Sequence, residues 1–410
     1  MSEQGRLNQL SARAKPPLWA GRVVALLGVI LAALSLRSGV ASLSPLIARV
    51  EVEVPMGPTT LGLVGALPAL AFGASALFTP AIGRRLGIER LMLIGVVLLT
   101  AGLAWRALVH DAFTLALSSG VVFVGIGIAN VLMPPIVKRY FPDRVPLITA
   151  LYVGIASISN ALPPLVAEPI AEVAGWRVSL GVWAIVAVLA VVPWLSLRHG
   201  HSAPDNGIVE ARISLLQVAK SPTAWGIMLV FSMSGITAYS AFAWMPRLMQ
   251  QHVGVDPVSA GALLAAFAIV GLPSALIVPI FAARRHGVAV ITGLSVVCLV
   301  TGYLGLIFAG PGAPWLWAVL IGAGPMVFPL ALVLVNLRTR THAGSVAVSG
   351  FVQAIGYFIA ASAPVVVGLL HERTGGWVVP LWLLAFAAVG IAVGGWLVAR
   401  NRFIEDELGS

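Results

Sequence analysis

The stretch of sequence at residues 19–48 reads WAGRVVALLGVILAALSLRSGVASLSPLIA. Apart from Arg22 and Arg37 it carries no charged side chain. A helix needs about 20 consecutive apolar residues to cross the hydrocarbon core of a bilayer, which is roughly 30 Å thick. The stretch is long enough to do so, and it therefore predicts a membrane-spanning helix.

The composition of the whole chain agrees with a lipid environment. Of its 410 residues, 59% are hydrophobic and 10% are charged, whereas soluble domains average roughly 45–50% apolar and about 25% charged residues. These values exclude intrinsic disorder, collagen and a secreted disulfide scaffold, and the single cysteine, Cys298, cannot form an intramolecular disulfide. The net charge of +10 is scattered over short loops, so no nucleic-acid partner is expected.

Eleven further apolar segments follow the first. The twelve predicted spans lie at about 19–48, 59–82, 91–109, 112–136, 146–170, 178–197, 223–249, 258–283, 288–309, 314–337, 343–370 and 378–399. We expect each of them to be helical, because unpaired backbone groups are too costly in lipid. The sequence thus predicts an all-α membrane protein.

Polar segments divide the chain into parts. A polar linker at 198–221 separates an N-terminal half at 19–197 from a C-terminal half at 222–399, and short tails lie at 1–18 and 400–410. With the N-terminus inside, nineteen of the 25 Lys and Arg residues fall on the cytoplasmic side, five fall on the other side, and Arg37 lies within the bilayer. The positive-inside rule therefore predicts a multi-pass protein of the cytoplasmic (inner) membrane with both termini in the cytoplasm.

The two halves resemble each other at an offset of about 200 residues. The matching pairs are Arg84-Arg85-Leu86-Gly87 with Arg284-Arg285-His286-Gly287, Gly175-Trp176 with Gly376-Trp377, Pro163 with Pro364, and Gly125-x-Gly127 with Gly322-x-Gly324. Each pair occupies the same place in the predicted topology. Six-span repeats in parallel orientation are typical of major facilitator transporters, whose substrate site lies between the halves near the midplane of the membrane.

Several motifs resemble those of one transporter family. They are the loop Pro80-Ala-Ile-Gly-Arg84-Arg85-Leu-Gly87-Ile-Glu89-Arg90, Gly127-Ile-Ala-Asn130-Val-Leu-Met-Pro134 with Val137-Lys138-Arg139-Tyr140-Phe141-Pro142, Tyr239 with Trp244-Met-Pro246, Gln353-Ala-Ile-Gly356-Tyr357, Gly368-Leu-Leu-His371 and Leu36-Arg37. The loop resembles the major facilitator signature G-x-x-x-D-R-x-G-R-R, with Pro80 at the first Gly and Arg84 at the Asp. As a set, the motifs resemble the cyanate permease and nitroimidazole transporter family (CynX/NimT).

The resemblance implies a twelve-helix major facilitator fold and a secondary transporter that works by alternating access. In this superfamily the first, fourth, seventh and tenth spans line the cavity, with the fifth and eleventh beside them. The family usually places Gln residues in the seventh span, where this chain has Ser234 and Thr237.

Arg37 is the candidate substrate-binding residue with the clearest physical basis. It lies 15 residues after Arg22 and 12 before Arg49, hence roughly 22 Å and 18 Å along a helix from either flank. A charge at that depth is costly and usually faces a cavity, and we find no acidic residue deep inside a span to pair with it. Its planar guanidinium can bind an anion with two hydrogen bonds or stack on a ring. The alternative is that it extends toward the interface or pairs with carbonyls of a broken helix.

Five other polar residues inside spans are candidate substrate contacts: Asn130, Tyr152, Tyr239, Gln353 and Tyr357. The offset of 201 places Arg37 opposite position 238, the neighbour of Tyr239, and places Tyr152 opposite Gln353. For each of them, as for Asn160, the alternative is an ordinary hydrogen bond between helices.

The loop residues Arg84, Arg85, Gly87, Arg284, Arg285 and Gly287 are candidates for gating. The basic pairs could cap helix C-termini and hold one conformation, or they could serve only as positive-inside anchors.

No enzymatic motif accompanies these features. The seven histidines lie in loops or at span ends, and neither a metal-ligand cluster nor a phosphate-binding loop is present, so we expect no metal and no cofactor. The favoured function is transport of a small anionic or polar, possibly heteroaromatic, solute by a monomer in the lipid bilayer. Two alternatives are a drug or nitroimidazole exporter with an apolar aromatic cavity, and a polytopic membrane enzyme or sensor without net transport.

Overall fold

The computed structural model describes residues 22–197, 215–284, 286–400 and 402–408. Within these ranges twelve helical spans are long and apolar enough to cross a membrane, which confirms the predicted number. They are Val23–Glu53, Pro58–Leu86, Ile88–Arg106, Ala112–Tyr140, Val145–Ala174, Trp176–Leu197, Pro222–Val253, Pro257–Ala282, Gly287–Gly312, Pro314–Leu337, Gly344–Thr374 and Val378–Val398. The predicted tail at 1–18 and most of the linker at 198–221 lie outside the described residues.

Several spans consist of more than one helical element. The N-terminal half contains α2 (Val23–Ser35), α3 (Ser38–Ala41), η1 (Ser44–Leu46), α4 (Ile47–Glu53), α5 (Pro58–Leu86), α6 (Ile88–Arg106), α7 (Ala112–Tyr140), α8 (Val145–Ala174) and α9 (Trp176–Leu197). The C-terminal half contains α11 (Pro222–Leu248), η2 (Met249–Val253), α12 (Pro257–Ile269), α13 (Gly271–Ala282), α14 (Gly287–Ala309), η3 (Gly310–Gly312), α15 (Pro314–Ala323), η4 (Gly324–Met326), α16 (Val327–Leu337), α17 (His342–Thr374) and α18 (Val378–Val398). Two short helices, α10 (Leu215–Val218) and α19 (Ile404–Leu408), lie outside the spans.

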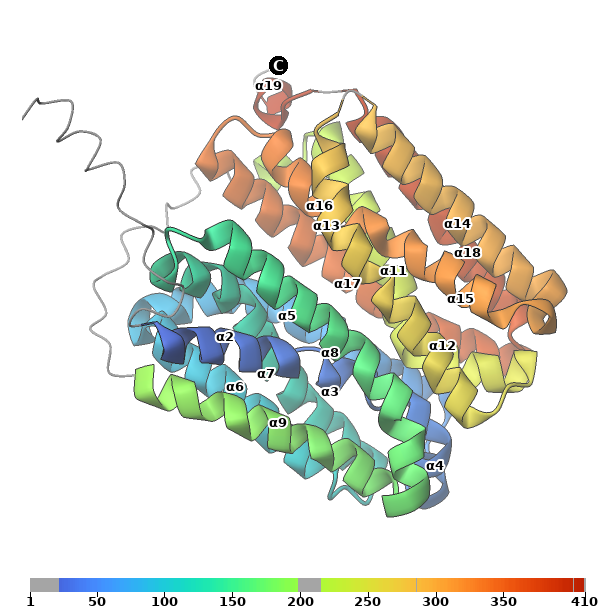
Figure 1. Cartoon of the computed structure of the whole chain (residues 1–410). Helices are drawn as coiled ribbons and strands as arrows, with labels where there is room; N and C mark the ends of the chain where they lie inside the picture. Colours follow the sequence, from blue (N-terminus) through green and yellow to red (C-terminus); the bar gives the residue numbers. More distant parts are fainter. Residues whose placement is uncertain (1–21, 198–214, 285, 401, 409–410) are drawn as a thin grey trace, which may run out of the picture.

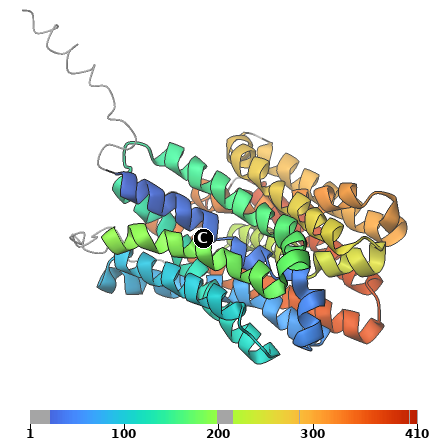
Figure 2. The same cartoon turned by 60° about the horizontal axis from the view of Figure 1, so that its bottom comes forward.

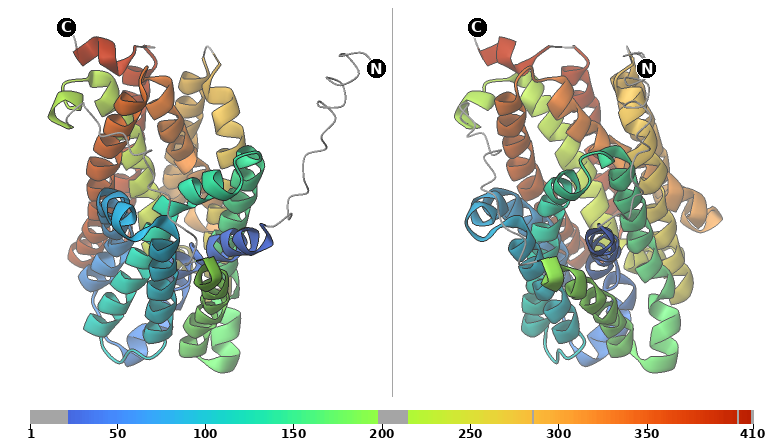
Figure 3. Two further views of the ribbon diagram at one scale, coloured as in Figure 1. Left: turned by 90° about the vertical axis from the view of Figure 1, so that its left-hand side faces the viewer. Right: turned by 60° about the vertical axis from the view of Figure 1, so that its left-hand side comes forward.

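The two halves lie side by side. Figure 1 shows the blue-to-green N-terminal half beside the yellow-to-red C-terminal half, and Figures 2 and 3 show the same division from other directions. We call the end at which α2 begins and α9 ends the linker end. The opposite end, where α4 ends and α12 begins, is called the distal end.

Large apolar side chains cover the outside of the bundle. Phe113, Ile185 and Phe386 are 75%, 65% and 68% exposed, and many Val, Leu and Trp side chains on other helices are similarly exposed. An apolar surface of this extent would cause aggregation in water. In a bilayer it contacts lipid tails, so the exposed surface agrees with the membrane location that the composition predicts.

The first span is not one continuous helix. Helix α2 ends at Ser35, Leu36 and Arg37 form a turn, and α3 contains only four residues before the chain continues through η1 into α4. Serine hydroxyls satisfy carbonyls near this break, since Ser35 Oγ donates to Leu31 O and Ser38 Oγ donates to Ser35 O. The break places Arg37 at a helix interruption, where irregular backbone in membrane proteins usually lines a cavity.

Two glutamates that lie near span ends, as the sequence indicates, are nevertheless buried. Glu168 of α8 is 1% exposed and accepts a hydrogen bond from Arg49 Nε at 2.6 Å. Glu89, at the start of α6, is 2% exposed and forms an ion pair with Arg139 at 3.1 Å. Both carboxylates tolerate burial because a guanidinium accompanies each of them.

Arg106 is also buried. The charge count includes it among the five basic residues on the side opposite the termini, and its side chain is fully buried in the N-terminal half. The predicted third span continued to residue 109, whereas α6 ends at Arg106, and the side chain turns inward to the carbonyl of Gly39.

Candidate functional site

Arg37 lies at the break in the first span with a half-buried side chain. Its side chain forms no hydrogen bond or ion pair with any residue that the structure describes. Its charge interacts electrostatically with the hydroxyl groups of Tyr239 and Tyr357, which come from the C-terminal half. The guanidinium of Arg37 therefore lies near residues of both halves.

Three aromatic rings, two of them the tyrosines near Arg37, pack together, and we call them the aromatic triad. Phe72 comes from α5, Tyr239 from α11 and Tyr357 from α17. Their ring centroids are 6.2 Å apart for Phe72 and Tyr357, 6.4 Å for Phe72 and Tyr239, and 6.5 Å for the two tyrosines, all with edge-to-face geometry. Phe231 packs behind Tyr357 at 5.0 Å. The triad thus combines one ring from the N-terminal half with two from the C-terminal half.

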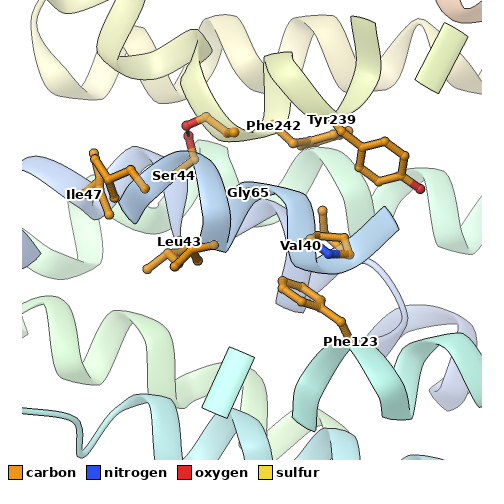
Figure 4. Close-up of a pocket in the computed structure, with 12 residues that line it drawn as sticks. Val40, Leu43, Ser44, Ile47, Gly65, Phe123, Tyr239 and Phe242 are labelled. Atoms are coloured by element: carbon orange, nitrogen blue, oxygen red, sulfur yellow. Dashed lines mark hydrogen bonds between the residues drawn. The ribbon is translucent and has the colours of Figure 1, made fainter. Parts of the chain in front are cut away.

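A small cavity of about 40 Å³ lies on the distal side of Tyr239. Figure 4 shows Val40 and Phe123 from the N-terminal half on one side of it, and Tyr239 and Phe242 of α11 on the other. Ser44 and Ala243, from opposite halves, both line this cavity, and Ser44 Oγ donates to the carbonyl of Ala243 at 3.1 Å. A cavity of this size holds little more than water, so the halves are nearly closed on the distal side of the triad.

The distal end holds further contacts between the halves. Arg247 Nη1 donates to Glu51 Oε1 at 2.8 Å, and Thr59 Oγ1 donates to Glu372 Oε2 at 2.5 Å. At Gly62 a Cβ atom would lie only 2.6 Å from the carbonyl oxygen of Pro364, so α5 and α17 approach each other too closely for any larger side chain. These contacts close the distal end.

A much larger cavity, of about 460 Å³, lies toward the linker end. It is lined by α5 on one side and by α16 and α17 on the other, with Asn336, Ser345, Ser349 and Gln353 as its polar residues. Gln353 Nε2 donates to Ser349 Oγ, and Ser345 Oγ donates to Asn336 Oδ1, both at 2.8 Å. Ser345, Ser349, Gln353 and Tyr357 are each four residues apart, so they lie on one face of α17 that leads to the triad.

The structure brings together only some of the predicted substrate contacts. Arg37, Tyr239 and Tyr357 are close to one another, whereas Gln353 lies one helical turn away in the larger cavity. Asn130 of α7 and Tyr152 of α8 are half-buried, as is Asn160, and none of the three side chains has a hydrogen bond to another described residue. Tyr152 packs against the same N-terminal apolar cluster as Tyr239 and Tyr357.

Ser234 and Thr237, which replace the Gln residues usual in the family, are buried and take part in packing. Ser234 Oγ donates to the carbonyl of Pro325 at 3.3 Å, and Thr237 Oγ1 donates to that of Met233 at 3.2 Å. The two side chains are 1% and 0% exposed. Their hydroxyls are therefore occupied within the C-terminal half.

The predicted gating residues lie at the linker end. Arg84 and Arg85 are exposed in the last turn of α5 and form no hydrogen bond or ion pair with described residues. Gly87 ends α5 with φ of 84°, a conformation that favours glycine. Arg284 lies over the ring of Phe281 at 4.3 Å, and Gly287 packs tightly on the Phe281 carbonyl. Arg285 lies outside the described residues.

Phe72 was missed by the sequence analysis, because an aromatic residue in an apolar span carries no distinctive pattern. Arg106 could have been singled out, since it lies within the predicted third span. Its position near the end of that span favoured the surface assignment instead. Among the described residues no group of His, Cys, Asp or Glu could hold a metal ion.

Twelve spans in two halves, with a charged and aromatic site between them, define a membrane transporter. The profile of the Major Facilitator Superfamily matches residues 25–361, and the chain belongs to this superfamily. It is a multi-pass secondary transporter of small solutes and not an enzyme, which confirms the expected class.

Curated relatives confirm the resemblance to the CynX/NimT family. The uncharacterized transporter YycB of Bacillus subtilis is 32% identical over 92% of this chain and 94% of its own. The 2-nitroimidazole transporter of Escherichia coli is 28% identical, covering 93% of this chain and 97% of its own. The cyanate transport protein CynX of Escherichia coli is 27% identical, covering 90% and 95%.

Solved structures support the fold. The nucleoside transporter NupG (D323A mutant) superimposes with a TM-score of 0.77 at 13% identity, covering 92% of this chain and 99% of its own. A bacterial homolog of the lysosomal transporter Spinster, in an inward-facing and unoccupied conformation, gives a TM-score of 0.70 at 13% identity, covering 97% and 95%.

Proposed function

We propose that this transporter carries a small anionic or polar solute bound between Arg37 and the aromatic triad. The observation that carries the proposal is the half-buried Arg37 without a hydrogen-bonding partner among the described residues, beside three rings drawn from both halves. An intramembrane cation without a carboxylate is costly. An anion, or a strongly polar acceptor such as a nitro group, would offset that cost.

The geometry also limits the shape of the solute. A guanidinium presents its donors in one plane and matches planar acceptors with two oxygen atoms. The edges and faces of the triad would pack on a flat body. The compounds for which two relatives are named, cyanate and 2-nitroimidazole, fit this description in part: each offers an electronegative end, and the second adds a flat heteroaromatic ring.

The difference between the two ends supports a mechanism of alternating access. The distal end is closed by contacts between the halves, and the larger cavity lies toward the linker end. In our proposal the linker end is cytoplasmic, as the charge count favours, so this conformation faces inward. The solute would leave along the polar face of α17, where neutral groups bind it more weakly than Arg37 does. In our proposal the unit of transport is a monomer, because all residues of the proposed site belong to one chain.

Purified protein in liposomes tests the proposal directly. The vesicles would be loaded separately with unlabelled cyanate, nitrite or 2-nitroimidazole, and uptake of the same labelled compound would be measured by counterflow. We expect exchange of at least one compound, and we expect Arg37→Ala to reduce it strongly at low solute concentration. The matched control is Arg400→Ala, because Arg400 lies over Trp396 at the linker end, away from the site. Normal exchange by Arg37→Ala would refute the proposal.

An exporter with an apolar aromatic cavity is the second candidate, and the aromatic triad favours it. In that case ring surface would supply most of the binding. Transport of 2-nitroimidazole would then survive Arg37→Gln but not Phe72→Ala, whereas our proposal expects both variants to be impaired.

A further inference from the structure

Arg106 is a second buried cation that the proposed site does not use. It is the last residue of α6, and its side chain is 0% exposed. Nη1 donates to the carbonyl of Gly39 at 2.7 Å, while Nε and Nη2 have no hydrogen-bond partner among the described residues. Its guanidinium carbon lies 5.3 Å from the centre of the Phe123 ring. No carboxylate forms an ion pair with it in the described part of the chain.

The position of Gly39 makes this contact significant. Gly39 belongs to α3, two residues beyond Arg37, in the short segment that follows the break. Gly39 also packs against α7 so closely that a Cβ atom would lie 2.5 Å from Val122 Cγ1. Helix α3 is therefore held both by close packing on α7 and by the hydrogen bond from Arg106.

A neutral side-chain donor could satisfy the carbonyl of Gly39 at a lower desolvation cost than the buried guanidinium of Arg106 does. A buried charge without a carboxylate partner carries a large desolvation penalty, so the long, rigid guanidinium must do more than satisfy one acceptor. Its planar fork and its contact with Phe123 fix its direction. Phe123 also lines the small cavity beside Tyr239. Arg106 thus links α6, the wall of that cavity and the segment that follows Arg37.

We propose that Arg106 is a positioning residue that holds α3 in place and thereby sets the direction of Arg37. The substrate-binding part of this inference rests on the proposed function. All its contacts lie within the N-terminal half, which moves as one unit during alternating access. Loss of Arg106 should therefore weaken substrate binding without slowing the conformational change.

The first test does not depend on the substrate. Ser38 is fully buried in α3, and the native Cys298 is buried in the C-terminal half. In Ser38→Cys we expect neither thiol to react readily with N-ethylmaleimide. Adding Arg106→Met should raise the labelling rate of the cysteine at position 38 at least fivefold and leave Cys298 unchanged, with Arg106→Lys in between. Unchanged labelling at position 38 would overturn the inference, and so would equal exposure of both thiols, which would indicate general unfolding.

The second test separates binding from turnover in liposomes, with cyanate and 2-nitroimidazole as probes. We expect Arg106→Met to raise KM about tenfold and to leave kcat within twofold of the parent, with partial recovery in Arg106→Lys. In the Arg37→Ala background Arg106→Met should add little, because the side chain that it positions is already absent.

If Arg37→Ala alone left KM unchanged, the proposed function would fail while the labelling result would still decide the role of Arg106 in holding α3. If Arg37→Ala raised KM and Arg106→Met did not, only this inference would fail.

Discussion

Glu51 of α4 and Arg247 of α11 form an ion pair across the two halves, with 2.8 Å between Oε1 and Nη1. Their side chains are only 22% and 19% exposed. Together with the Thr59–Glu372 and Ser44–Ala243 hydrogen bonds, the pair joins the halves at the distal end. Each of these bonds must break when the distal end opens, so they contribute to the balance between the two conformations.

The first prediction concerns this ion pair. Glu51→Gln should shift the balance toward distal opening by about fivefold, because a partly exposed pair contributes about 1 kcal/mol. The readout is labelling of Leu61→Cys, since Leu61 lines the small cavity and is 8% exposed. Glu172→Gln is the matched control, because that carboxylate contacts Arg49 within the N-terminal half. Equal labelling in the two variants would show that the pair does not hold the distal end.

The second prediction concerns Arg37. Charge-assisted hydrogen bonds contribute roughly 1.5–3 kcal/mol, so Arg37→Ala should weaken substrate binding by about 10- to 150-fold. Arg37→Lys should recover only part of the affinity, because it keeps the charge and loses the planar fork. The variants should still fold, since no described residue depends on the Arg37 side chain for a hydrogen bond. Binding to purified protein and thermal unfolding measure the two effects, and parental affinity in Arg37→Ala would remove the argument for an anionic solute.

The third prediction separates the rings from the charge. Phe72→Leu should weaken binding of 2-nitroimidazole about fivefold, since an aromatic contact contributes about 1 kcal/mol beyond area burial. Cyanate has no ring and should be less affected. Competition assays on both compounds, with the lipid-facing Phe113→Leu as control, provide the comparison. A uniform effect on both solutes would mean that Phe72 supports the fold of the site rather than the ring of the solute.

The fourth prediction concerns energy coupling. Glu168 is buried, which makes it the carboxylate best placed to carry a proton, but it is paired with Arg49 inside one half. We therefore expect exchange or facilitated diffusion, or entry of a proton only with the solute. Glu168→Gln should lower stability, because it removes the partner of Arg49, and should leave exchange intact. The expectation would be contradicted if a pH gradient drove accumulation of a solute that carries no proton, and if Glu168→Gln abolished that accumulation.

The fifth prediction concerns orientation. If the linker end is cytoplasmic, a cysteine at Ser259 should react with an impermeant reagent applied outside intact cells, and one at Ser202 should react only after permeabilisation. Ser259 lies in the first turn of α12 at the distal end, and Ser202 lies outside the described residues. The native Cys298 is buried and gives little background. The reverse labelling pattern would invert the topology.

Much of the architecture could be predicted from the sequence, because membrane insertion depends on local properties. Each span needs only enough consecutive apolar residues, and the twelve segments satisfy that condition independently of one another. The repeat is also visible in the sequence, for example in the offset between Pro163 and Pro364. Finding it requires only a comparison of positions along the chain and no knowledge of which residues are in contact. The isolation of Arg37 is equally visible, because every other charge lies close to a span end or loop.

Tertiary structure alone decided which side chains meet. Phe72 joins Tyr239 and Tyr357 because α5 packs between the halves, and no periodicity in its span indicates this. Gln353, placed by the repeat among the central residues, lies in the larger cavity because one turn of α17 separates it from Tyr357. Arg106 turns inward to a carbonyl that is available only where the first span is broken. Hydrophobicity determines how many helices cross the bilayer, whereas the direction of each polar side chain depends on close packing between helices distant in sequence.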